Sequence, residues 1–162
     1  MSKKFIPKSR AFLIILSVCS WSRVHGKFFV FSPNDIQPKH ILETFKSDLK
    51  VSKLCLGCMS FGQRTEKWPW VLNQEQTDEM IKKALDLGIN FFDTANCYWD
   101  GTSEIFIGNS FKKLVKNRND IVVATKVFAN EGKLSREAIL REIDGSLKRL
   151  QMDYVDLYII HR

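Results

Sequence analysis

Residues 89–99 of the chain read Ile89-Asn90-Phe91-Phe92-Asp93-Thr94-Ala95-Asn96-Cys97-Tyr98-Trp99. An apolar, strand-like run stops here at the carboxylate of Asp93, and the phenol of Tyr98 follows five residues later. Two later apolar runs stop in the same way, one at Lys126 and one at His161. The carboxyl ends of parallel strands lie on one face of a sheet or barrel, which is where ligands bind. If these runs are parallel strands, we expect the ionisable side chains to converge there.

The chain from residue 51 onward alternates strand-like and helix-like segments. Strands are predicted at 51–56, 89–92, 121–125 and 154–160, and helices are predicted to begin at Asn73, Ser103 and Ser135. Asn73 and Gln76 have the spacing of a capping box, and Gly88 ends the first helix. Strand starts recur about every 30–35 residues, the length of one strand-plus-helix unit. Such units build either an open doubly wound sheet or part of an eight-unit barrel. No Gly-x-Gly-x-x-Gly follows the first strand, which disfavours a Rossmann dinucleotide site.

Length and composition indicate one globular domain, because 162 residues with 44% hydrophobic content can bury a sizeable core. The formal net charge of +7 is unevenly distributed. Residues 1–50 hold nine Lys or Arg and three Asp or Glu, whereas residues 51–162 hold sixteen and fifteen. The folded part is therefore close to neutral. We expect no nucleic-acid role, since such a role needs a basic patch on the folded part.

The chain contains four cysteines, too few and too unevenly placed for a disulfide framework. Cys55 and Cys58 have the Cys-x-x-Cys spacing of a redox or zinc motif. A zinc site would need two more ligands, for which only Cys97 and His161 are candidates. A thioredoxin-like pair would open a helix, but this pair lies in a strand pattern. We therefore expect free, buried or half-buried thiols and no metal.

The first 26 residues have the three parts of a secretory signal. These are a basic start, an apolar run of about eleven residues, and a final stretch with residues that are acceptable before a signal-peptide cleavage site. The apolar run is too short to cross a bilayer of about 30 Å as a helix, so no stable membrane span is expected in the mature chain. Residues 27–46 read as a linker or a second targeting segment. The expected destination is the secretory pathway. A plastid-type organelle, or the cytoplasm if the start codon is mis-assigned, are the alternatives left open.

The convergent side chains are candidates for a general acid site. A phenol has a reference pKa of about 10. The positive charge of Lys126 would lower the pKa of Tyr98, while Asp93 would hold the lysine in place. Neutral His161 would donate a hydrogen bond to a substrate oxygen. Such a site delivers a proton to a carbonyl oxygen as hydride arrives at carbon. The alternative is a structural ion pair beside a core tyrosine, and spacing alone leaves both open.

Four motifs in order resemble the aldo-keto reductases. They are SDLKVSKLCLGCMSFG at 47–62, GINFFDTANCY at 88–98, VVATK at 122–126 and MDYVDLYIIHR at 152–162. The resemblance is greatest to the bacterial-type branch, which also includes relatives of potassium-channel β-subunits. It implies a TIM-type (β/α)8 barrel and NADPH-dependent reduction of a small aldehyde or ketone.

The resemblance also implies roles for individual residues. Tyr98 is the proton donor, Lys126 lowers its pKa, Asp93 partners the lysine next to the cofactor, and His161 orients the carbonyl. Gly57, Cys58 and Met59 match the loop that touches the nicotinamide end of the cofactor, although many members have Thr and an aromatic residue in place of Cys58 and Met59. Tyr98, Trp99 and His161 would contact the substrate. Trp99, with Trp68 and Trp70, either walls the substrate pocket or simply packs the loops.

Family members continue for four more strand-helix units, so residues 47–162 correspond to the amino-terminal half of a barrel. A half barrel exposes two strand edges, which predicts self-association. The residues that grip most of the cofactor belong to the other half, so the chain alone is predicted to be inactive. The alternative to an enzyme fragment is a non-catalytic remnant, or a half barrel that pairs with a partner.

Overall fold

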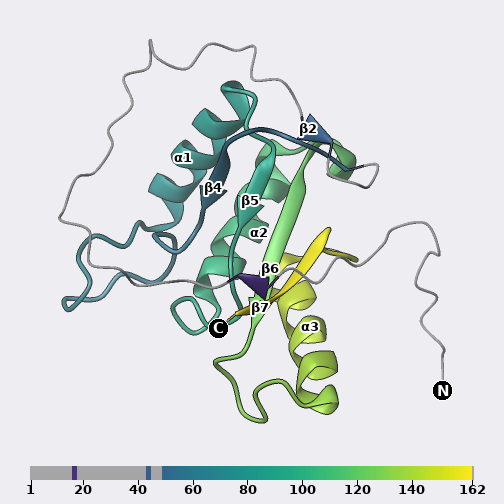
Figure 1. Cartoon of the computed structure of the whole chain (residues 1–162). Coiled ribbons are helices and arrows are strands. Elements are labelled where there is room, and N and C mark those ends of the chain that lie inside the picture. Colours follow the sequence, from purple (N-terminus) through teal and green to yellow (C-terminus); the bar gives the residue numbers. More distant parts are fainter. Residues whose placement is uncertain (1–15, 18–42, 45–48, 162) are drawn as a thin grey trace.

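The computed structural model describes residues 16–17, 43–44 and 49–161 of the chain. Its main elements are β4 (Cys55–Gly57), α1 (Gln74–Asp86), β5 (Phe91–Asp93), α2 (Thr102–Leu114), β6 (Val122–Val127), α3 (Arg136–Leu150) and β7 (Leu157–His161). Three two-residue strands, β1 (Leu16–Ser17), β2 (Glu43–Thr44) and β3 (Lys50–Val51), and one 3-10 helix, Arg118–Asp120, complete the described part (Figure 1).

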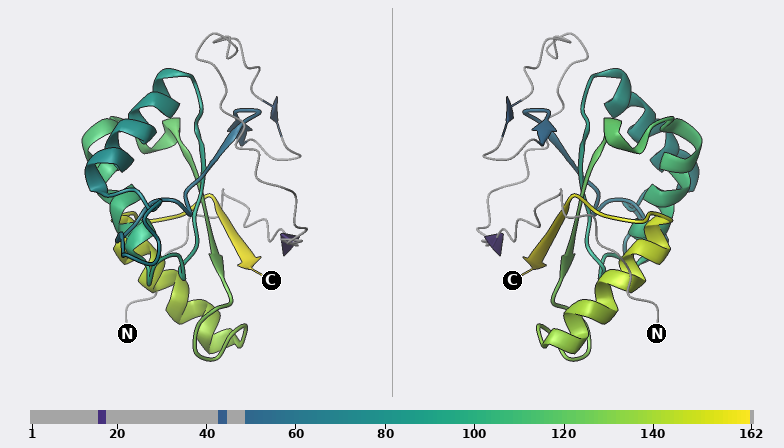
Figure 2. Two further views of the ribbon diagram at one scale, coloured as in Figure 1. Left: turned by 90° about the vertical axis from the view of Figure 1, so that its left-hand side faces the viewer. Right: turned by 90° about the vertical axis from the view of Figure 1, so that its right-hand side faces the viewer.

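The strands β4, β5, β6 and β7 are parallel and adjacent in chain order, within a sheet ordered β1-β7-β6-β5-β4. The helices α1, α2 and α3 all lie on one face of this sheet (Figure 2). A doubly wound sheet carries helices on both faces, whereas a barrel carries them only on its outer face. The arrangement is therefore that of the first four units of a (β/α)8 barrel, and the expected truncated barrel is confirmed.

The helices begin where the sequence supplies caps. The Asn73 side chain accepts a hydrogen bond from the Gln76 amide while the Gln76 side chain accepts one from the Asn73 amide, which confirms the capping box. Ser135 caps α3 by accepting a hydrogen bond from the amide of Ala138. Gly88, at φ 78°, takes the left-handed conformation that ends a helix. These local signals fix where α1 and α3 start and where α1 stops.

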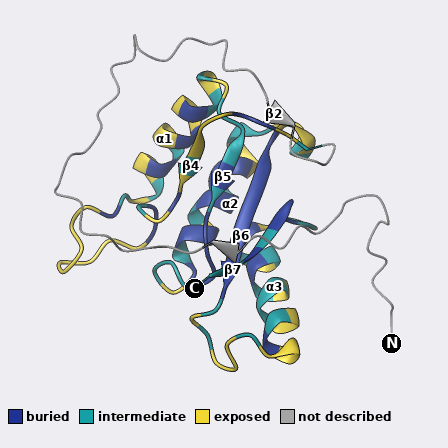
Figure 3. Ribbon diagram, in the orientation of Figure 1, coloured by how far each residue is buried: buried dark blue, intermediate teal, exposed yellow. Residues whose placement is uncertain are grey.

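The core lies between the helices and the sheet, where the buried residues of Figure 3 concentrate. Phe92 of β5 stacks edge-to-face on Phe111 of α2, with ring centroids 4.9 Å apart. Because side chains alternate across a strand, Phe91 points to the opposite, inner face. A second apolar cluster lies there, comprising Val51, Val122, Ala124, Leu157 and Ile159. The sheet thus buries side chains on both faces, as parallel sheets do.

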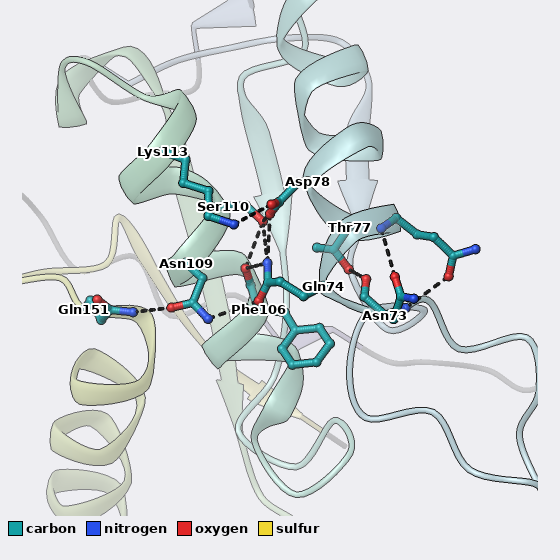
Figure 4. Close-up of polar contacts among 10 residues, drawn as sticks. Asn73, Gln74, Thr77, Asp78, Phe106, Asn109, Ser110, Lys113 and Gln151 are labelled. Atoms are coloured by element: carbon teal, nitrogen blue, oxygen red, sulfur yellow. Dashed lines mark hydrogen bonds and ion pairs between the residues drawn. The ribbon is translucent and has the colours of Figure 1, made fainter.

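Polar contacts join the three helices to each other (Figure 4). The Asp78 carboxylate of α1 accepts a hydrogen bond from Ser110 and pairs with Lys113, both in α2, at 2.5 and 2.6 Å. Asn109 of α2 accepts a hydrogen bond of 2.7 Å from the Gln151 side chain, just after α3. These contacts set the spacing of the helix layer that supports the strands.

The predicted first strand, 51–56, is wrong in detail, because the structure divides it into β3 and β4. β3 pairs antiparallel with β2, while β4 pairs parallel with β5. The break falls at Ser52, whose hydroxyl donates to the Leu54 carbonyl and whose amide donates to the Asn90 side chain. These local hydrogen bonds compete with a continuous strand ladder and turn the chain.

The start of α2 also differs from the prediction. Its N-cap is Gly101, at φ 83°, and not Ser103. Ser103 lies within the helix, fully buried, and its hydroxyl donates to the Cys58 carbonyl at 2.8 Å. Ile105 of α2 is exposed and does not lie on the inner face of the helix. Helix periodicity places the inner stripe on Ile107 and Phe111.

The predicted signal segment 1–26 and linker 27–46 lie outside the described residues, apart from 16–17 and 43–44. Leu16 and Ser17 pair in parallel with Ile160 and His161 at the edge of β7. The sheet is open, with β1 and β4 as its two edge strands, and removal of residues 1–26 as a signal would leave β7 as an edge in place of β1. Within the described ranges, no helix is long and apolar enough to cross a membrane.

Candidate active site

Lys126 is the centre of the candidate site. It lies near the end of β6 with its side chain almost fully buried, and its Nζ has three partners. Nζ lies 2.8 Å from Asp93 Oδ2, donates to the Thr94 carbonyl at 2.9 Å, and donates to the Tyr98 hydroxyl at 3.2 Å. Burial by itself would lower the pKa of Lys126. The Asp93 carboxylate and the Tyr98 hydroxyl favour the charged form, and together they outweigh burial, so the net pKa is raised. Lys126 therefore stays charged.

Tyr98 reaches this lysine from the loop after β5. Its amide donates to the Ala95 carbonyl, and Lys126 Nζ lies 4.8 Å from the centre of its ring. The expected lowering of its pKa is not seen. Burial raises the pKa of Tyr98 above its ordinary value, and the nearby charge of Lys126 only partly opposes that effect. The phenol is therefore protonated at neutral pH and can act as a proton donor.

His161, the last residue of β7, completes the predicted group. Its ring meets that of Tyr98 edge-to-face, with centroids 5.6 Å apart and planes at 86°. Burial lowers its pKa, and the positive charge of Lys126 lowers it further. The imidazole is thus neutral near pH 7. The structure brings Asp93, Tyr98, Lys126 and His161 together, as the strand-end argument predicts.

Four residues are predicted to bind the cofactor: Asp93, described above with Lys126, and Gly57, Cys58 and Met59, which differ in their accessibility. Gly57, at the end of β4 opposite Asp93, is exposed and has nothing within 4 Å of where a Cβ would stand. Met59 is exposed as well, at 46%. Cys58 is fully buried; its amide donates to the Asp93 carbonyl and its carbonyl accepts from Ser103. Gly57 and Met59 therefore leave open surface at the end of β4, whereas the side chain of Cys58 is not accessible to a ligand.

A cavity of about 300 Å³ opens beside Tyr98. It is lined by Met59, Cys97, Tyr98, Trp99 and Asp100. Sequence reasoning placed Met59, Tyr98 and Trp99 at the site but missed Cys97 and Asp100. Asp100 follows Trp99 directly, and both have a left-handed backbone, at φ 54° and 52°. Two consecutive non-glycine residues in this region are uncommon, and only the fold reveals them.

Trp99 connects the loop after β5 to the loop between β4 and α1, beside the cavity. Its indole N–H donates to the Met59 carbonyl at 2.5 Å, and its ring packs edge-to-face on Trp70 and Trp68, with centroids 5.3 and 5.8 Å away. Gly62 makes room for it, since a Cβ there would lie 2.8 Å from the indole. The tryptophans therefore both pack the loops and, through Trp99, line the cavity.

A buried ion pair supports β6 from the helix side. Glu104 of α2 is fully buried, and its carboxylate accepts a hydrogen bond from Thr125 at 2.5 Å and pairs with Arg149 of α3 at 2.6 Å. Thr125 directly precedes Lys126. Glu104 thus ties the lysine-bearing strand to two helices. In the sequence, Glu104 is one of several charged residues in an amphipathic helix. Its buried contacts with Thr125 and Arg149 could not be predicted from that pattern.

The prediction of free, buried or half-buried thiols is confirmed for Cys58, which is buried, and for Cys97, which is half-buried, but Cys55 is exposed as a residue. Cys55, Cys58 and Cys97 are free. Burial raises the pKa of Cys55 to about 12 and raises that of Cys58 as well, so neither carries a reactive thiolate at neutral pH. Among the described residues, no group of three or more His, Cys, Asp or Glu side chains is placed to hold a metal ion.

The chain matches known proteins over its folded part. The model of the aldo/keto reductase family matches residues 53–162. An uncharacterised oxidoreductase of Bacillus subtilis is 40% identical over 130 residues, covering 72% of this chain and 38% of that protein. A protein of Oryza sativa named "Probable voltage-gated potassium channel subunit beta" is 37% identical over 123 residues, covering 72% of this chain and 35% of that one. The chain thus spans less than half the length of these relatives.

A solved structure supports the same relationship. An aldo-keto reductase from Klebsiella pneumoniae in complex with NADPH superposes with a TM-score of 0.61 at 27% identity, over 75% of this chain and 39% of that one. The family model covers well over half of the chain, and the four motif residues Asp93, Tyr98, Lys126 and His161 meet at the strand ends. The chain belongs to the aldo/keto reductase family.

Proposed function

We propose that this chain carries the proton-donating part of an NADPH-dependent carbonyl reductase site, with a small aldehyde or ketone as substrate. The observation that carries the proposal is the 3.2 Å contact between Lys126 Nζ and the Tyr98 hydroxyl, with Asp93 Oδ2 2.8 Å from the same nitrogen. A protonated phenol beside a fixed cation is a general acid whose conjugate base is stabilised as the proton leaves.

Each residue has one role in this proposal. Tyr98 donates its proton to the carbonyl oxygen, and Lys126 stabilises the phenolate that remains. Asp93 holds the lysine in position and keeps it charged. Neutral His161, whose ring borders that of Tyr98, donates a hydrogen bond that orients the same oxygen. NADPH, when bound, supplies the hydride that reaches the carbonyl carbon.

The cofactor assignment rests on the family and on the open access along Gly57 and Met59. An NADPH complex of an aldo-keto reductase is among the similar structures. The open backbone of Gly57 stands in register with Asp93, so a nicotinamide ring placed there would adjoin the Lys126 and Tyr98 pair. We expect the 162-residue chain by itself to show no NADPH-dependent reduction, because Gly57 and Met59 offer contacts to one end of the cofactor only.

The test compares Tyr98→Phe with wild type in the longest protein translated from the gene. NADPH oxidation is followed by absorbance with benzaldehyde as substrate. Tyr98→Phe should lower kcat at least 100-fold, because general acid catalysis contributes about 10²–10⁴-fold. Near-UV circular dichroism and NADPH affinity serve as the folding controls and should not change. Equal, measurable activity in both proteins would contradict Tyr98 as the proton donor, and no NADPH oxidation by either protein would favour the alternative of a non-catalytic remnant or binding partner.

We also propose that β4 is a site of self-association. In the sheet β1-β7-β6-β5-β4, β4 pairs only with β5 along the part of the chain that the structure describes. An unpaired parallel edge is a template for another chain. Sedimentation velocity should show dimers or larger species of the 162-residue chain, and a monomer at 50 μM would contradict the proposal.

We propose, finally, that residues 1–26 act as a secretory signal. The proposal rests on the basic start and apolar run of that segment. Fusing residues 1–26 to a reporter should deliver it into the secretory pathway with cleavage near residue 26. Cytoplasmic retention of the reporter would favour a mis-assigned start codon.

A further inference from the structure

We propose that Cys97 is a positioning residue that fixes His161 in the tautomer with its proton on Nε2. The observation is a contact of 3.7 Å between Cys97 Sγ and His161 Nδ1, across 64 residues of sequence. The functional meaning of the tautomer rests on the proposed role of His161 in orienting a carbonyl. The Cys97 contact itself can be tested without any activity.

The chemistry of the two groups sets the direction of this hydrogen bond. Burial raises the pKa of Cys97, so the group is a thiol at neutral pH, while burial and Lys126 lower the pKa of His161, so the ring is neutral. A neutral imidazole has one bare nitrogen, which is a good acceptor, whereas thiol sulfur is a weak acceptor. The favoured arrangement is therefore S–H donating to bare Nδ1. The single ring proton then resides on Nε2.

The backbone holds both partners in place. The amide of Asn96, next to Cys97, donates to the Lys126 carbonyl at 3.1 Å. His161 is the last residue of β7, and its ring packs edge-to-face on Tyr98. The loop that presents the thiol is thus the loop that presents the phenol. The backbone at both ends and the ring of His161 are therefore held in place.

The charged groups around the pair favour a singly protonated ring. Lys126 and Asp93 act on His161, and Lys126 and Glu104 act on Cys97. Lys126 acts against a second proton on the ring, and Asp93 does not reverse its effect because the pKa of His161 remains lowered. No hydrogen bond occupies Nε2 among residues 49–161. Nε2–H is therefore the free donor of the ring.

The tautomer matters because the two forms treat a carbonyl oxygen in opposite ways. With the proton on Nε2, the ring can share that oxygen with the Tyr98 hydroxyl as a second donor. With the proton on Nδ1, the donor faces sulfur, and the bare Nε2 would repel the oxygen lone pairs. Cys97 thus selects the form in which His161 can bind the substrate carbonyl.

The experiment measures the ring tautomer directly by two-bond ¹H–¹⁵N correlation NMR at pH 7.5, in the 162-residue chain labelled with ¹⁵N-histidine. The chain has three histidines, and the His161 signals are those that disappear in His161→Gln. Cys97→Ala removes the donor, and Cys97→Ser restores a hydroxyl donor of similar size. A single neutral hydrogen bond changes an equilibrium by about two- to tenfold.

We expect the Nε2–H form in wild type and in Cys97→Ser, and a two- to tenfold gain of the Nδ1–H form in Cys97→Ala. Predominance of Nδ1–H in wild type would overturn the proposal, even if Cys97→Ala failed to fold. An unchanged tautomer ratio in folded Cys97→Ala would also overturn it. Loss of activity in Tyr98→Phe tests the reductase function separately, so the two ideas can fail independently.

Discussion

Lys126 Nζ lies 2.8 Å from Asp93 Oδ2, although 33 residues separate the two in the chain. The parallel register of β5 and β6 brings them together, since Asp93 is opposite Ala124 and Lys126 lies two residues beyond it on the same face. The lysine side chain is 6% exposed and that of the aspartate 30%. The pair is therefore a buried cation held by a carboxylate that still reaches solvent.

Removal of the Lys126 charge should raise the pKa of Tyr98 further. Lys126→Met keeps the length of the side chain but removes the cation that favours the phenolate. The chain has three tyrosines, so phenolate absorbance is titrated in parallel with a Tyr98→Phe chain to isolate Tyr98. Lys82→Met, which removes an exposed cation paired with Asp86 on α1, is the matched control and should leave the titration unchanged. An unchanged or lowered pKa in Lys126→Met would contradict the site geometry.

Stability should decrease as the pH falls below about 6.5, the ordinary pKa of histidine. The pKa of His161 is lower in the folded chain than in the unfolded chain. At pH values between these two pKa values, the unfolded chain therefore binds more protons than the folded chain. The stability contributed by neutral His161 is present above this window and is lost as the pH falls through it. His161→Gln should flatten the dependence of the urea midpoint on pH between 7 and 5. Identical slopes in both chains would show that the ring is not held neutral.

Glu104 should be among the residues most sensitive to truncation. Glu104→Ala leaves Arg149 and Thr125 without their buried partner, which should cost about 3–5 kcal/mol in the free energy of unfolding. The double variant Glu104→Leu with Arg149→Met removes both charges and should cost much less. Urea denaturation measures both. The exposed pair of Lys82 and Asp86 is the control, and breaking it should cost about 0.3–0.5 kcal/mol. A similar loss for the exposed and buried pairs would argue against burial as the cause.

Gly62 should not tolerate alanine. A Cβ at Gly62 would meet the Trp99 side chain and the Thr102 hydroxyl at 2.8 Å, at a φ of 150°. We expect Gly62→Ala to cost about 1–3 kcal/mol. We also expect it to change the near-UV circular dichroism of the tryptophan cluster, because Trp99 must move. Gly57→Ala is the matched control, since nothing lies within 4 Å of its added carbon. Equal losses of stability and equal near-UV spectra in both variants would contradict the inference that Trp99 packing excludes a side chain at Gly62.

Much of the fold could be predicted because its signals are local. The capping box at Asn73, the cap at Ser135 and the ending of α1 at Gly88 each depend on neighbours within a few residues. The helix stripe and the apolar strand runs likewise follow from short-range periodicity. The predictions failed where a distant partner intervened: Ser103 bonds to Cys58 instead of capping a helix, and Ser52 bonds to Asn90 instead of continuing a strand.

The sequence by itself determined which ionisable residues end the strands, because apolar runs that stop at Asp93, Lys126 and His161 can be read directly. Only the tertiary structure decided the protonation of the site. Burial outweighs the effect of Lys126 on Tyr98, so its pKa rises although sequence reasoning predicted a fall. The contact between Cys97 and His161 also appears only in the folded chain. Desolvation and long-range contacts depend on what surrounds a side chain in three dimensions, and strand spacing does not encode that.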